Sequence, residues 1–106
     1  MSLNLWALPK DKTLRAALLK LDQRFGKRRF TLSERRCDHP GAVVLCKPDQ
    51  PEVLAYIYTF GQETDCFGLQ LEYPRFPDTP APTPDVHENL SLDRLADLLR
   101  IHFDVV

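Results

Sequence analysis

The sequence predicts an α+β fold in which an antiparallel meander of three to four strands is flanked by an N-terminal and a C-terminal helix, in the order α-β-β-β-β-α. Apolar residues recur at helical spacing near both ends of the chain. The middle instead holds short apolar runs separated by turn residues, and short turns favour antiparallel neighbours. A length of 106 residues suits one domain, so we expect a single α+β domain over residues 1–106.

The first predicted helix covers residues 11–25. Asp11 or Thr13 suits its N-cap, and Gly26 suits the position just beyond its end, where glycine is favoured. Leu19 falls outside the apolar stripe, on the polar face, so we expect its side chain to be exposed. The apolar stripe itself consists of Leu14, Ala17, Leu18, Leu21 and Phe25.

Four segments in the middle of the chain have the pattern of strands. They cover residues 28–36, 42–47, 53–60 and 66–73. The third is apolar on both faces, which is typical of a central strand. The fourth alternates, so that Phe67, Leu69, Leu71 and Tyr73 share one face.

Proline dominates residues 74–84, where five of eleven positions are proline, a density that no helix or strand interior tolerates. We therefore assign residues 74–90 to a Pro-rich connection that leads to the second helix. The segment also contains two P-x-x-P patterns of the kind that SH3-like domains bind, so linker and ligand remain alternatives. The second helix is predicted over residues 92–103, with Ser91 as its N-cap.

Seven residues are predicted to form the centre of the core, because they lie on these stripes or in the central strands. They are Leu18, Leu21, Ile57, Leu69, Leu71, Leu95 and Leu99. Of the three cysteines, Cys46 and Cys66 lie in apolar runs and are expected to be small buried hydrophobes.

Several features bear on compartment. An odd cysteine count argues against a disulfide framework. The first residues lack the pattern of a secretory leader, and no apolar run is long enough to span a bilayer. We therefore expect a cytoplasmic location with reduced thiols and no membrane contact.

Charge is distributed unevenly along the chain. Residues 1–47 hold eleven basic and four acidic residues, a net charge of +7. Residues 48–106 hold three basic and eleven acidic residues, a net charge of −8. This asymmetry points to an acidic partner for the first half or to attraction between two copies, unless the halves lie side by side and their fields cancel.

Motifs for common enzyme chemistries are missing. The chain has no P-loop, dinucleotide fingerprint, Gly-x-Ser-x-Gly or His-Glu-x-x-His pattern, so we predict neither a cofactor nor a metal. A thiol enzyme centred on Cys37 is one alternative, because His39 lies two residues away and an imidazole activates a thiol. Pro40 and Gly41 end any strand there, which favours a polar turn instead.

We therefore predict a small non-enzymatic protein–protein interaction module of the adaptor, immunity or chaperone-like kind. An apolar arm over residues 1–10 precedes the first helix, and we expect it either to fold back on its own sheet or to pack on a partner or on a second copy. Packing on a second copy would give a homodimer. The candidate partner-binding residues are Leu3, Leu5, Trp6, Leu8 and Leu19.

The alternative function is nucleic-acid binding through the basic segment 12–36. Its candidate phosphate contacts are Lys27, Arg28, Arg29, Arg35 and Arg36. Phe30, with Tyr56 or Tyr58 on a neighbouring strand, would supply base stacking. An isoelectric point near 6.3 and the absence of an RNP1 pattern make nucleic acid the less favoured partner.

Overall fold

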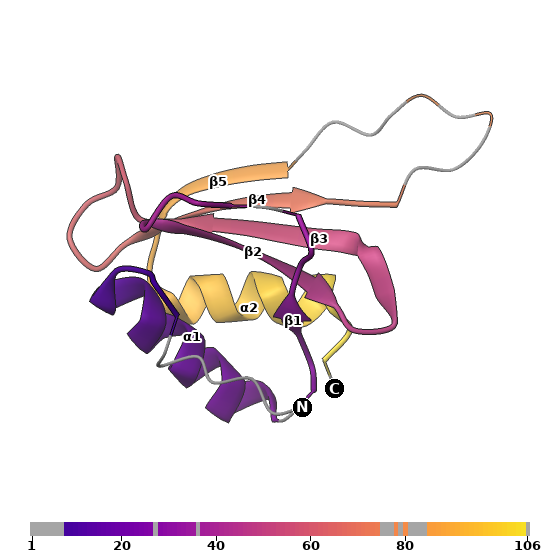
Figure 1. Ribbon diagram of the computed structural model, residues 1–106, viewed down its shortest axis with the longest axis horizontal. Coiled ribbons are helices and arrows are strands. Elements are labelled where there is room, and N and C mark those ends of the chain that lie inside the picture. Colours follow the sequence, from indigo (N-terminus) through magenta and orange to yellow (C-terminus); the bar gives the residue numbers. More distant parts are fainter. Residues whose placement is uncertain are drawn as a thin grey trace.

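The computed structural model describes residues 8–26, 28–35, 37–74, 78, 80 and 85–105. Two helices pack on one face of a five-stranded antiparallel sheet, which confirms the predicted α+β class (Figure 1). The elements in chain order are α1 (Lys12–Phe25), β1 (Thr31–Leu32), β2 (Ala42–Lys47), β3 (Gln50–Tyr58), β4 (Phe67–Glu72), β5 (Asp85–Leu90) and α2 (Leu92–His102).

The sheet is a meander in which spatial order follows chain order from β1 to β5. Each neighbouring pair is antiparallel, as the short turns predict. The register sets Val43 opposite Ile57 and Ile57 opposite Leu69, so these apolar side chains form one row across the sheet on the side of the helices.

The structure has one strand more than the sequence predicts, because residues 85–90 of the expected connection form the edge strand β5. The segment reads DVHENL, and its two apolar residues give it little strand pattern of its own. Pairing with β4 holds it in place, and a register shift near Asn89, whose φ is 51°, marks a bulge.

The strand predicted over residues 28–36 is shortened to the two residues of β1. The Ser33 N–H still donates to the Val44 carbonyl oxygen (2.9 Å), after which the chain leaves the sheet. Phe30 and Leu32 both pack on the helix side of the sheet, which agrees with their spacing of two.

Helix α1 begins and ends almost where the sequence predicts. The Asp11 side chain makes no capping bond, whereas its backbone N–H donates to the Pro40 carbonyl oxygen (2.8 Å). Gly26 ends the helix with a φ of 88°, a value that residues with a Cβ rarely adopt. The five residues of the predicted apolar stripe are all buried.

The expected exposure of Leu19 is wrong, because the residue is half-buried and packs against the core. Helix α1 contacts α2 as well as the core beneath the sheet, so it buries more than a single stripe. A leucine beside the stripe therefore reaches apolar neighbours.

Helix α2 starts at the predicted cap, where the Ser91 hydroxyl oxygen accepts a hydrogen bond from the Arg94 N–H (3.2 Å).

All seven residues predicted for the centre of the core are buried. Cys46 is buried as predicted, but Cys66 is only half-buried, because it lies in the turn before β4. Within the described residues, neither helix is long and apolar enough to cross a bilayer.

Candidate functional site

Both helices lie under the same face of the sheet, and among the described residues no helix covers the opposite face (Figure 1). We call this opposite side the outer face. Strand alternation assigns side chains to it, since neighbours along each strand point to opposite sides. They include Val44, Cys46, Leu54, Tyr56, Tyr58, Gly68, Gln70, Glu72, Val86 and Glu88.

The chain between β1 and β2 crosses part of the outer face, and we call residues 33–35 and 37–41 the crossing segment (Figure 1). Arg35 forms an ion pair with Glu72 of β4. Cys37 packs on a small buried cluster of Val44, Cys46 and Leu54. The Lys10 ammonium donates to the backbone oxygens of Cys37 (2.7 Å) and His39 (3.0 Å), which fixes the far end of the segment.

An aromatic row lies beside the crossing segment. Tyr56, Tyr58 and Phe60 alternate along β3 and just beyond it, with ring centroids 5.4 Å and then 4.9 Å apart. The His39 ring continues the row at 4.7 Å from Phe60. Gly68 leaves the space for Tyr58, because a Cβ at Gly68 would come within 2.1 Å of the Tyr58 ring.

A polar network joins the aromatic row to the edge strand. The Tyr58 hydroxyl donates to one carboxylate oxygen of Glu88 (2.9 Å), and the Gln62 side-chain amide donates to the other. The Gln62 side-chain oxygen accepts from the Asn89 N–H. Burial, together with the hydrogen bond to Glu88 and its charge, raises the pKa of Tyr58 to about 12.

These residues line a wide-open hollow of about 510 Å³ on the outer face. We call it the aromatic hollow, and it is lined by Tyr56, Tyr58, Phe60, Gly61, Gln62, Gln70, Glu88 and Asn89. Among the lining residues that the structure describes, Glu88 is the one that carries a charge. Phe60 is 44% exposed, so part of the aromatic surface is open to a partner.

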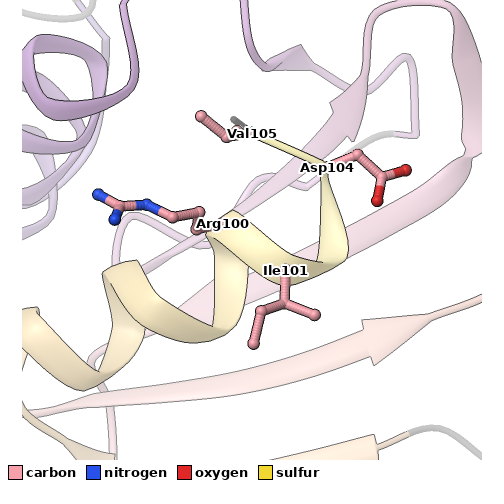
Figure 2. Close-up of a pocket in the computed structure, with 4 residues that line it drawn as sticks. All are labelled: Arg100, Ile101, Asp104 and Val105. Carbon is pink, nitrogen blue, oxygen red and sulfur yellow. The ribbon is translucent and has the colours of Figure 1, made fainter.

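A second hollow, of about 390 Å³, lies at the C-terminal end of α2 and is lined by Arg100, Ile101, Asp104 and Val105. Figure 2 shows these side chains pointing in different directions rather than toward one centre. Asp104 is paired with Lys47, and Ile101 is 76% exposed. The residues therefore form no converging set of polar groups, and the aromatic hollow is the better candidate site.

The predicted partner-binding residues do not gather into one surface within the described part of the chain. Leu8 is half-buried against the core, as Leu19 is. Leu3, Leu5 and Trp6 lie outside the described residues.

The structure separates the predicted features of a nucleic-acid site. Phe30 is 5% exposed and lies in the core, so the stacking role predicted for it is wrong. Arg28 and Arg29 are exposed, but Arg35 is paired with Glu72. Lys27 and Arg36 lie outside the described residues.

Cys37 and His39, both within the described residues, form no hydrogen bond with each other. The His39 Nδ1 accepts from the Gly41 N–H (2.9 Å), and its ring packs on Phe60. The Cys37 side chain packs instead on the apolar cluster of the outer face. The described residues also contain no group of three or more histidines, cysteines or acids that could hold a metal ion.

Sequence reasoning identified the tyrosines but missed the hollow. The alternation of Tyr56, Tyr58 and Phe60 was a usable signal for one aromatic face. Glu88 was missed because it lay in the expected connection.

Comparisons with protein-family models, curated proteins and solved structures give no match for this chain.

Proposed function

We propose that this chain is a small non-enzymatic protein-interaction module that binds its partner through the aromatic hollow. The observation that carries the proposal is a row of three aromatic side chains that line a hollow, on the face of the sheet that neither described helix covers. Aromatic residues are enriched in protein interfaces and dominate binding energy when they fill or line pockets.

Contacts within the chain already order the rings of Tyr58 and Phe60 in the absence of a partner. Tyr58 lies over Gly68 and donates to Glu88, while Phe60 packs between Tyr58 and His39. A side chain that is already ordered loses little conformational entropy on binding. The amides of Gln62, Gln70 and Asn89 supply the polar surroundings that are typical of an interface rim.

A cytoplasmic location belongs to the same proposal. Cys37, Cys46 and Cys66 are all free thiols, which suits a reducing compartment. Burial raises the pKa of the Cys46 thiol, which keeps that thiol protonated and unreactive.

Self-association stays part of the proposal as an alternative partner choice. If the apolar arm joins two copies, the full chain dimerises at tens of micromolar, and deletion of residues 2–8 weakens the dimer. Sedimentation equilibrium of both proteins tests this. A full chain that stays at its monomer mass of 12.2 kDa up to about a millimolar removes the homodimer and leaves a different protein as the partner.

The proposed function is tested by selecting binders from a displayed random-peptide library with the folded full chain. Selected peptides are then measured against the parent, against Phe60→Ala in the aromatic row, and against Ile101→Ala on the exposed side of α2. We expect Phe60→Ala to weaken binding about tenfold or more and Ile101→Ala to leave it unchanged. Peptides that bind both variants like the parent contradict the proposed binding face.

A further inference from the structure

We infer that the aromatic hollow binds an arginine side chain of the partner, with the guanidinium group against the aromatic row and its N–H groups on the Glu88 carboxylate. The inference rests on the proposed function and specifies the chemistry of the partner. It follows from three properties of the hollow: the Glu88 carboxylate without a cationic partner, the aromatic row, and the Gln70 side-chain amide without a hydrogen-bond partner among the described residues.

The carboxylate is the first property. Glu88 accepts hydrogen bonds from Tyr58 and Gln62, and both donors are neutral. A carboxylate has about four acceptor sites, so two hydrogen bonds leave room for a forked donor. Within the described residues, no cationic side chain pairs with Glu88.

The aromatic row favours a guanidinium group over other cations. A guanidinium ion is planar and weakly hydrated, and it stacks against aromatic rings while donating two parallel hydrogen bonds to a carboxylate. Tyr56, Tyr58 and Phe60 line the same hollow as Glu88, and Phe60 is 44% exposed, so an open ring and a charge are available to one side chain. An ammonium group is more strongly hydrated and lacks the fork geometry.

The third property is the Gln70 side chain, which lines the hollow and has no hydrogen-bond partner among the described residues. Its oxygen is available to a further guanidinium N–H. A guanidinium group carries five N–H donors, so it can contact Glu88 and Gln70 together.

Other occupants fit less well. A purely apolar side chain would cover Glu88 without replacing its water, and an unpaired carboxylate is costly to desolvate. A phosphate or a carboxylate would meet the negative charge of Glu88.

The test is an NMR titration of the isotope-labelled full chain with two blocked tripeptides, Gly-Arg-Gly and Gly-citrulline-Gly. Citrulline keeps the size and planarity of arginine but carries no charge. We expect the arginine peptide to shift the amide signals of Tyr58, Gln62 and Glu88 with a saturable, millimolar dissociation constant, and the citrulline peptide to bind about tenfold more weakly.

Two variants locate the effect. Glu88→Gln removes the charge but keeps an oxygen that accepts from Tyr58, so the fold is expected to persist, as a dispersed spectrum will show. Glu63→Gln removes an exposed charge from the neighbouring loop, outside the lining of the hollow, and serves as the matched control. Arginine binding should weaken about tenfold in Glu88→Gln and stay unchanged in Glu63→Gln.

The outcomes separate this inference from the proposed function. Equal shifts with both tripeptides, equal weakening by both variants, or no shift with either tripeptide overturns the arginine assignment. Library peptides that need Phe60 but contain no arginine also overturn it while leaving the interaction module intact. If no library peptide depends on Phe60, the proposed function itself fails.

Discussion

The two faces of the sheet are built from the same strands but are stabilised in different ways. Among the described residues, the inner face joins both helices in a cluster of eighteen buried apolar residues. The outer face buries three residues in its own cluster, Val44, Cys46 and Leu54, and holds its aromatic row with a glycine, a carboxylate and a crossing segment. Burial therefore accounts for the inner face, whereas specific contacts determine the shape of the outer face.

This difference separates stability from binding. Side chains of the inner face are fully enclosed, so changes there act on the free energy of unfolding. On the outer face, Phe60 and Glu88 are exposed at the aromatic hollow, so changes at these residues act mainly on the hollow and on what it binds. Four predictions test this difference.

The largest effect is expected on the inner face. Leu71→Ala removes a side chain that is 3% exposed and leaves a cavity, so the free energy of unfolding should fall by about 2–5 kcal/mol. Its chain neighbour Gln70 points to the outer face, so Gln70→Ala should change stability by less than about 0.5 kcal/mol. Denaturant unfolding measures both. Equal midpoints for Leu71→Ala and the parent contradict this assignment of the faces.

A smaller effect is expected at the glycine under the aromatic row. In Gly68→Ala the new methyl group collides with the Tyr58 ring, which must move, so the free energy of unfolding should fall by about 1–3 kcal/mol. In a Tyr58→Ala background the same change meets no ring and should cost nothing. A double-mutant cycle measures the difference, and additive effects would show that the two residues do not interact.

High pH should weaken the outer face. The pKa of Tyr58 is raised to about 12 in the folded chain, above the usual value of about 10 for an unfolded chain. The stabilisation associated with this shift is therefore fully present below pH 10 and is lost as pH rises through about 12.

Glu88→Gln removes the charge that contributes to the raised pKa, so Tyr58 should ionise at lower pH in that variant. Ultraviolet titration of tyrosinate tests this, and Glu63→Gln is the control. An unchanged titration of Tyr58 in Glu88→Gln would show that the charge of Glu88 does not contribute to the raised pKa of Tyr58.

The smallest effect is expected at His102, on α2. Its Nε2 lies 2.8 Å from the Leu54 carbonyl oxygen, and its ring packs edge-on against Tyr73. Burial is the main cause of its lowered pKa, with opposing contributions from that hydrogen bond and from Asp104.

Because folding disfavours protonation of His102, its stabilising contribution is present above the unfolded pKa of about 6.5 and is lost as pH falls through the lower folded value. Denaturant unfolding between about pH 7 and 5 should show this loss, and His102→Gln should reduce it. The same pH dependence in His102→Gln and the parent would assign the loss to other groups.

Local pattern alone determined both helices and the orientation of the core strands. The stripe that ends at Phe25 and the alternation of Phe67, Leu69 and Leu71 each assign a buried face, because side-chain direction repeats with a fixed period in a helix or a strand. The sequence also predicted Ser91 as the N-cap of α2, since its side chain satisfies a backbone N–H of the adjacent turn.

Only the tertiary structure decided the outer face. β5 has little pattern of its own and is held by backbone pairing with β4, which leaves no signature in side-chain type. Tyr58 and Glu88 are thirty residues apart, and the register that joins them follows from two strand pairings and a bulge. Periodicity predicts the face of the sheet to which a side chain points. The residues that it contacts on that face depend on which distant strand pairs with its own.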